Sequence, residues 1–183
     1  MNARRVISLG IVLSLAAASA TIACSGPPKG EIERRVSTRA SPGSFRANGV
    51  SVVFERRCGS LDCHGSLTRN MRIYSSRGLR LPNDAGLVVG GGDTTLDEIT
   101  ANYQSILTVE PEQTNAVIDG ADPYTLLIMK KPLDAPAGEK HKGGAAFKKG
   151  DDAEHCILSW LKEDILNPID KAACAGAAIF PKE

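Results

Sequence analysis

Aromatic residues are scarce in this chain. Phe, Trp and Tyr together make up 4% of its 183 residues, and there is a single Trp. A chain of this length has room for one domain with a modest core. Because large rings usually supply much of the buried apolar surface, such a core needs another source of cohesion. Disulfides or a buried cofactor would provide it.

An excess of charge of either sign is also lacking. The chain has 22 basic and 21 acidic residues, which gives a formal net charge of +1 at pH 7. Nucleic-acid-binding domains usually carry a clear excess of basic residues. The composition therefore gives no reason to expect a nucleic-acid partner.

Long apolar runs are confined to the beginning of the sequence. Residues 1–23 contain two early arginines, an apolar stretch at 6–18 and then small residues. This order is typical of an export signal, and the run is too short and wrongly flanked for a stable membrane span. Cys24 follows the sequence TIA, which is similar to a lipoprotein cleavage site. We expect lipidation of Cys24, which would anchor the exported chain to a membrane of the cell envelope. Ordinary cleavage near this position is the alternative.

Residues 24–47 mix Pro, Gly, Ser and charged residues without an apolar period. This composition is typical of a flexible tether. The remaining residues, 48–183, are expected to form one folded domain. They show no internal repeat and little of the alternation that indicates strands.

Helical patterns dominate the expected domain. Thr95 and Glu98 have the spacing of a capping box in front of an apolar stripe. A second clear stripe runs through Trp160. We therefore predict an all-α fold class with long loops. We expect four helices. The first begins near residue 48 or 51 and ends at 58, and the other three begin at 95, at 122 and at 151 or 152.

The motif with the most chemical content is CGSLDCH, which ends in Cys63 and His64. Covalent attachment of haem needs two thiols that reach the two vinyl groups of one porphyrin, and a histidine that falls beneath the iron. The common spacing is C-x-x-C-H. Here two more residues separate Cys58 from Cys63, while Cys63 and His64 remain adjacent. The intervening Gly, Ser and Asp residues permit the turn that the longer spacing requires.

Two other interpretations of this motif remain open. A disulfide between Cys58 and Cys63 would close a small loop that contributes little stability, and the protein would then be a disulfide-stapled envelope lipoprotein with a binding or structural role and no haem. A zinc site would need a further ligand. The candidates for that ligand are His141, His155 and Cys156.

The stretch VFERRCGSLDCHG, with KPL, HKGG and CILSWL downstream, resembles the cytochrome c-like domains of exported bacterial proteins. Some of those domains have the same C-x4-C-H spacing. The resemblance covers roughly residues 48–165. It implies a small cytochrome c-like helical domain whose long loops surround one covalent haem c. It also implies thioethers at Cys58 and Cys63, and His64 as the proximal iron ligand.

The second axial ligand of such a haem has few candidates in this sequence. Met71 follows the motif too closely to cross the haem, and His155 lies off the apolar stripe of its helix. Met129 is separated from Pro132 by two lysines, whereas the family often has Met followed directly by Pro. His141 stands on a Gly-rich loop, where the resembling domains often have an H-G-G-like motif. We favour His141, with Met129 as the alternative; an open iron would suit a haem enzyme or a sensor.

The five cysteines divide without remainder under this interpretation. Cys24 takes the lipid, and Cys58 and Cys63 take the haem. Cys156 and Cys174 are left, and we expect a disulfide between them in an oxidising compartment.

The expected function is single-electron transfer in the cell envelope. No Ser-His-Asp spacing or similar nucleophilic arrangement is present, so a carrier is favoured over an enzyme. A cluster of lysines near His141 would suit an acidic redox partner, although a solvated surface explains it equally well. These lysines are Lys130, Lys131, Lys140, Lys142, Lys148 and Lys149.

Overall fold

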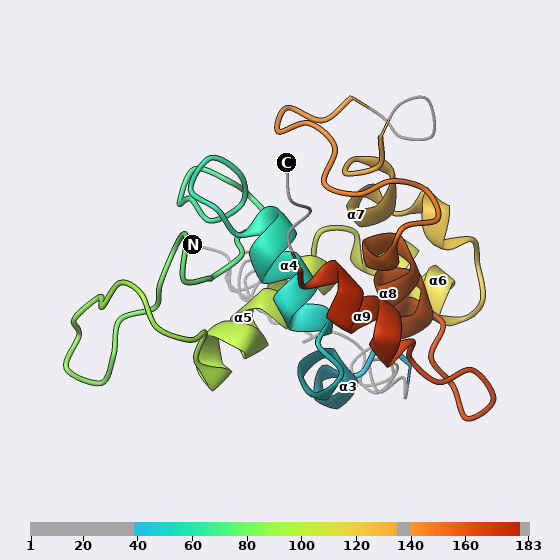
Figure 1. The fold of residues 1–183 in the computed structure, drawn as a ribbon, viewed down its shortest axis with the longest axis horizontal. Coiled ribbons are helices and arrows are strands. Elements are labelled where there is room, and N and C mark those ends of the chain that lie inside the picture. Colours follow the sequence, from blue (N-terminus) through green and yellow to red (C-terminus); the bar gives the residue numbers. More distant parts are fainter. Residues whose placement is uncertain (1–38, 135–139, 180–183) are drawn as a thin grey trace, which may run out of the picture. The chain divides into compact units, whose positions relative to one another are not determined.

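Seven α-helices and one 3-10 helix form the regular structure of residues 39–134 and 140–179, the part of the chain that this computed structural model describes (Figure 1). In chain order they are α3 (Pro42–Ala47), α4 (Val50–Cys58), α5 (Leu96–Leu107), α6 (Pro111–Ile118), η2 (Pro123–Thr125), α7 (Leu127–Lys130), α8 (Asp152–Leu161) and α9 (Lys171–Ala177). The described residues form isolated β-bridges but no sheet. The predicted all-α class is therefore confirmed.

All the described residues belong to one unit, Ser37–Glu183. Within that described part, we find no helix whose length and apolar character would allow it to cross a membrane.

Three helices lie where local signals in the sequence predict them. Helix α4 ends at Cys58, as expected. Helix α5 begins with a complete capping box, in which the Thr95 hydroxyl accepts from the Glu98 amide and the Glu98 carboxylate accepts from the Thr95 amide. The carboxylate of Asp151 caps α8 by accepting from the amide of Glu154. The caps of α5 and α8 satisfy backbone donors that a helix start leaves free.

The pattern that begins at Asp122 does not form one helix. Asp122 caps the 3-10 helix η2 by accepting from the Tyr124 amide. Leu126 then adopts an extended conformation, with φ −73° and ψ 139°, and separates η2 from α7. Its side chain is 1% exposed. Core burial of Leu126 accompanies the break that the local pattern did not predict.

Helix α3 lies inside the segment predicted to be a tether. The Ser41 hydroxyl accepts from the Ser44 amide, and a proline occupies the first turn, so the helix start is well formed. Phe45 is completely buried. The folded unit therefore extends N-terminal of the predicted boundary at residue 48, because Phe45 contributes a ring to the core. The predicted signal peptide 1–23, Cys24 and the tether as far as residue 38 lie outside the described residues.

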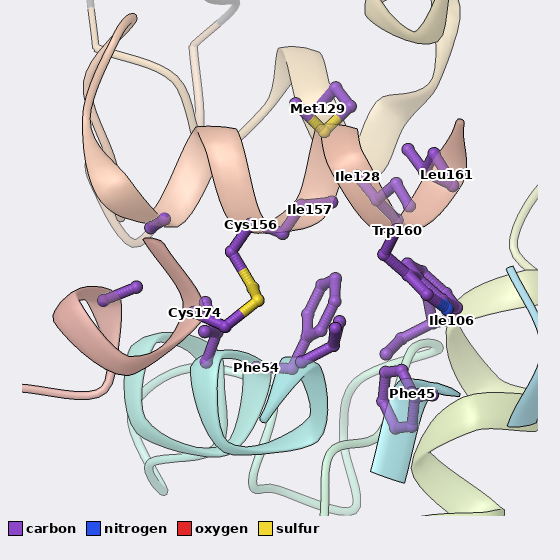
Figure 2. Packing of buried hydrophobic residues seen from close by; sticks show 14 of the residues in the cluster. Phe45, Phe54, Ile106, Ile128, Met129, Cys156, Ile157, Trp160, Leu161 and Cys174 are labelled. Carbon is purple, nitrogen blue, oxygen red and sulfur yellow. A yellow bond between two sulfur atoms is a disulfide. The ribbon is translucent and has the colours of Figure 1, made fainter. Parts of the chain in front are cut away.

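Four of the eight aromatic residues form one cluster. Phe45, Phe54, Tyr103 and Trp160 meet where α3, α4, α5 and α8 pack, with ring centroids 5.2 to 6.4 Å apart. Figure 2 shows the rings of Phe45 and Phe54 beside Trp160. Pairs at such distances add about 0.5–1.5 kcal/mol each beyond the area that they bury. A low aromatic content thus still produces a dense centre.

Helix α9 is fastened to the rest of the unit at two points. The predicted disulfide between Cys156 of α8 and Cys174 of α9 is present, and both residues are buried (Figure 2). At the other end of α9, Arg56 donates to the carbonyl of Ala178, and Arg57 Nε donates to a neighbouring carbonyl at 3.3 Å. Together these contacts form what we term the α9 clamp. It satisfies carbonyls that a helix end leaves without partners.

A buried ion pair holds the long loop before α5. Glu98 is 1% exposed and accepts from Arg80 Nε and from the Leu81 amide, each at 2.8 Å. Arg80 also donates to the carbonyls of Gly91 and Asp93 in that loop. Burial raises the pKa of Glu98, but the hydrogen bonds from Arg80 and from the backbone outweigh it, so this pKa lies below its ordinary value.

Candidate functional site

The CGSLDCH segment folds into a compact turn at the end of α4. The amide of His64 donates to the carbonyl of Cys58 at 2.8 Å. The amides of Cys63 and Gly65 both donate to the carbonyl of Ser60, at 3.0 and 2.9 Å. Both cysteines of the turn are half-buried free thiols. The structure thus brings Cys58, Cys63 and His64 together without the small disulfide loop that was one alternative.

Close backbone packing accommodates the two additional residues of this spacing. A methyl group added at Gly65 would lie 2.2 Å from the carbonyl oxygen of Gly59, and one added at Gly78 would lie 2.1 Å from the same atom. The Ser75 hydroxyl donates to that oxygen at 2.6 Å. We term Gly59, Gly65 and Gly78 the glycine junction. Only residues without a side chain permit this approach.

A second loop carries His141 to the site. The base of this loop is closed by a parallel bridge between Leu133 and Phe147, which are both buried. The amide of Phe147 also donates to the carbonyl of Pro132 at 3.2 Å. Within the loop, the Nδ1 atom of His141 lies 2.9 Å from the carbonyl oxygen of Gly144. The position of His141 is therefore set by core contacts at the base and by a local hydrogen bond at the ring.

The rings of His64 and His141 face each other as a pair. Their centroids are 5.9 Å apart and their planes differ by 12°. The Nδ1 atom of His64 lies 2.9 Å from the carbonyl oxygen of Met71, as that of His141 does from Gly144. Because a carbonyl only accepts, each Nδ1 must carry a proton, and in the neutral form of the ring each Nε2 then keeps a free lone pair. Backbone partners of this kind are typical of histidines that bind metals.

The protonation of this site favours neutral groups. Burial lowers the pKa of His64, although the hydrogen bond with Met71 opposes the change. The imidazole is therefore neutral at pH 7, which is the form that binds a metal. Burial raises the pKa of the Cys58 thiol to about 12, so this cysteine is not a thiolate ligand waiting for an ion.

The separation of the two rings suits a single metal centre. A bond from a metal to an imidazole nitrogen is about 2.0–2.1 Å, so two imidazole rings whose centres lie roughly 6 Å apart are near enough to share one metal. Two ligands alone do not hold a simple ion. Among the described residues, no three His, Cys, Asp or Glu side chains gather as an ion site. The pair therefore offers two of the nitrogen ligands that a metal centre needs, and a bound group would have to supply the rest.

The space at the pair is a slot of about 80 Å³ with apolar walls, to which Phe54, Ile128 and Pro132 contribute. Ligand pockets usually enclose about 300–1,000 Å³, so this slot would cover only the centre of a haem-sized group. Gly143 borders it closely. A methyl group there would lie 3.5 Å from His141 Cε1 and 3.7 Å from Cys63 Sγ.

The structure separates the four residues considered as second ligand. His141 lies opposite His64. Met129 is completely buried in the core and does not line the slot. His155 is exposed on α8. Met71 borders the slot and supplies the backbone carbonyl that orients His64.

The zinc interpretation loses one of its candidate ligands, since Cys156 is in the disulfide. Sequence reasoning missed the backbone carbonyls of Met71 and Gly144 and the glycine junction. No side-chain type marks a carbonyl that orients a histidine, and only the closely spaced glycines gave a signal of tight packing.

Comparisons with family models, with curated proteins and with solved structures find no match for this chain.

Proposed function

We propose that this protein is an exported monohaem c-type cytochrome that transfers single electrons in the cell envelope. The observation that carries the proposal is the pairing of His64 and His141. Their rings are nearly parallel at 5.9 Å, each Nδ1 is held by a backbone carbonyl, and two free thiols stand at the same turn. A cytochrome c-like arrangement of the helices is part of the same proposal.

Cys58 and Cys63 would attach one haem. Each thiol would add across a vinyl group, with sulfur bonded to the carbon nearer the ring and the thiol hydrogen transferred to the outer carbon, so this addition needs no net oxidant. The glycine junction supports this role because it fixes the turn that carries both thiols.

His64 and His141 would be the proximal and distal ligands. When bound, the haem would supply reversible one-electron chemistry at its iron. The protein would orient both imidazoles through Met71 and Gly144 and exclude water with the apolar walls of the slot. Ligation by two histidines would give a lower potential than His and Met together, and it would leave no open position for a substrate. Met129 is the less favoured ligand because it lies in the core.

Export is supported by the Cys156–Cys174 disulfide, since such bonds persist in oxidising compartments. Lipidation of Cys24 would then hold the protein at a membrane of the envelope. Lys140 and Lys142, which flank His141, are exposed, and they would favour docking of an acidic redox partner.

The test is to produce the mature chain in a host that attaches c-type haem. We would denature it, extract it with acidified acetone, and record the reduced pyridine spectrum of the protein fraction. Haem that stays with the protein would establish covalent attachment, and the α-band would report one or two thioethers. Replacing both Cys58 and Cys63 by Ala should abolish this retention. A colourless wild-type protein from a competent host would refute the proposal.

Ligand variants then test the pair. His141→Ala should open the distal position, so that the reduced protein binds carbon monoxide and its low-spin spectrum is lost. His155→Ala is the matched control, because His155 is exposed on α8 and should leave the spectrum unchanged. If Met129→Leu opened the iron and His141→Ala did not, the distal assignment would be wrong.

A further inference from the structure

Arg57 of α4 donates side-chain hydrogen bonds both to the loop of His141 and to the end of α9. Its Nε atom donates to the carbonyl of Ala177, and its Nη1 atom donates to the carbonyl of Ala146, each at 3.3 Å. It also lines the slot beside the histidine pair.

Ala146 connects Arg57 with the segment that orients the ring of His141. Its amide donates to the carbonyl of Pro132 at 2.8 Å, so both the amide and the carbonyl of Ala146 are hydrogen-bonded. Two residues earlier, Gly144 accepts from His141. Loss of the Arg57 contact would free the carbonyl side of the segment that carries the orienting group of His141.

The other partner of Arg57 belongs to the α9 clamp. Ala177 lies three residues after Cys174, which is bonded to Cys156 of α8. In Figure 1, α8 and α9 lie side by side and α9 approaches α4. Through its Nε atom, Arg57 is thus held against the disulfide-linked helix, and through its Nη1 atom it holds the His141 loop. Arg56 donates a hydrogen bond to the neighbouring carbonyl of Ala178 and does not line the slot.

We propose that Arg57 is a positioning residue for His141, joining the His141 loop to the disulfide-linked helix α9. This inference deepens the proposed function and rests on it for the ligand role of His141. The contacts themselves do not depend on a bound group. Because Arg has a planar group with several fixed donors, it can serve two carbonyls at once, whereas Lys has a single compact ammonium.

The first measurement is amide hydrogen exchange on the full mature chain with wild-type Arg57, Arg57→Gln, Arg57→Lys and Arg56→Gln. Hydrogen bonds to a charged group contribute enough that losing one on a part-exposed loop should raise exchange at Ala146 and Phe147 roughly ten-fold. Arg57→Gln and Arg57→Lys should both show this. Arg56→Gln should leave these amides within about two-fold of wild type, because it removes a contact with α9 only.

The second measurement uses the haem-loaded protein. Binding of cyanide requires His141 to leave the iron, so its apparent affinity follows the fraction of molecules with that ring displaced. Arg57→Gln should raise this affinity roughly ten-fold, and Arg56→Gln should not. Replacing Cys156 and Cys174 by Ala should raise it in wild type but add little in the Arg57→Gln background, as expected for coupled contacts.

Three outcomes would overturn the inference. The first is equal loop exchange in Arg57→Gln and Arg56→Gln. The second is wild-type behaviour of Arg57→Lys, which would make the effect one of charge rather than of position. The third is full additivity of the disulfide and Arg57 effects. A colourless chain would instead refute the proposed function, and the exchange experiment would still decide the role of Arg57.

Discussion

Breaking the Cys156–Cys174 disulfide should lower the free energy of unfolding by about 3 kcal/mol. The two cysteines are 18 residues apart in the sequence. In the chain-entropy model, closing a loop of this length removes roughly 11 cal/mol/K from the unfolded state, which is about 3 kcal/mol at 25 °C. A domain of this kind has a total stability of about 5–15 kcal/mol. The disulfide is therefore a substantial part of what keeps the unit folded.

Urea unfolding followed by fluorescence measures this effect directly. Trp160 is the single tryptophan of the chain and is completely buried, so its emission reports on the core that α8 and α9 share. With a urea dependence of about 1–3 kcal/mol/M, adding a thiol reductant should lower the midpoint by roughly 1–3 M. The variant with Ala at both Cys156 and Cys174 should show the lower midpoint in either condition.

An unchanged wild-type midpoint in reductant would refute this contribution of the disulfide. An equal shift of the double-Ala variant in reductant would also refute it, because the effect would then come from other thiols.

Two further predictions concern other parts of the unit. Glu98→Gln should cost about 3 kcal/mol at pH 7, because it leaves the charge of Arg80 buried without its partner. The pKa of Glu98 is depressed in the folded state. The extra unfolding free energy of wild type over the variant should therefore be full above pH about 4.5 and fall as the pH drops through the lower folded pKa. Urea curves between pH 2 and 7 measure this difference, and a difference independent of pH would contradict the prediction. Gly78→Ala should lower the free energy of unfolding by about 1–3 kcal/mol, because the added methyl group would overpack against Gly59. Gly90→Ala is the control, since a methyl group there meets nothing within 4 Å, and it should change this free energy by no more than about 0.5 kcal/mol. Equal thermal midpoints for the two variants would show that the glycine junction is not tight.

Local signals explain which helices could be predicted from the sequence. The capping box at Thr95 and the stripe through Trp160 act within one or two turns, so they are visible without tertiary contacts. Helix α9 is different. Its sequence, KAACAGA, has no stripe of large apolar residues. Its position depends instead on Cys174 and on arginines from α4. Phe45 likewise belongs to the core only because rings from three other helices surround it.

The candidate site was predictable in its side chains and not in its backbone. Adjacent Cys63 and His64 point to haem chemistry, and the Gly-rich context of His141 favours it as the opposite ligand. The separation of the two rings depends on the bridge between Leu133 and Phe147, which closes the loop of His141 and forms only in the folded chain. The glycine junction unites residues from the motif and from a later turn, and this contact exists only in the folded chain.

The arrangement of the cysteines has a consequence for the order in which the protein matures. Four cysteines allow three ways of forming two disulfides, and the structure uses one pair while Cys58 and Cys63 remain thiols. If the chain is exported from its N-terminus as proposed, these two thiols would reach an oxidising compartment well before Cys156 and Cys174. During that interval they would be each other's nearest partner along the chain. Maturation of the proposed cytochrome would therefore require that they be kept reduced or be consumed first, so that only the later pair is left to oxidise.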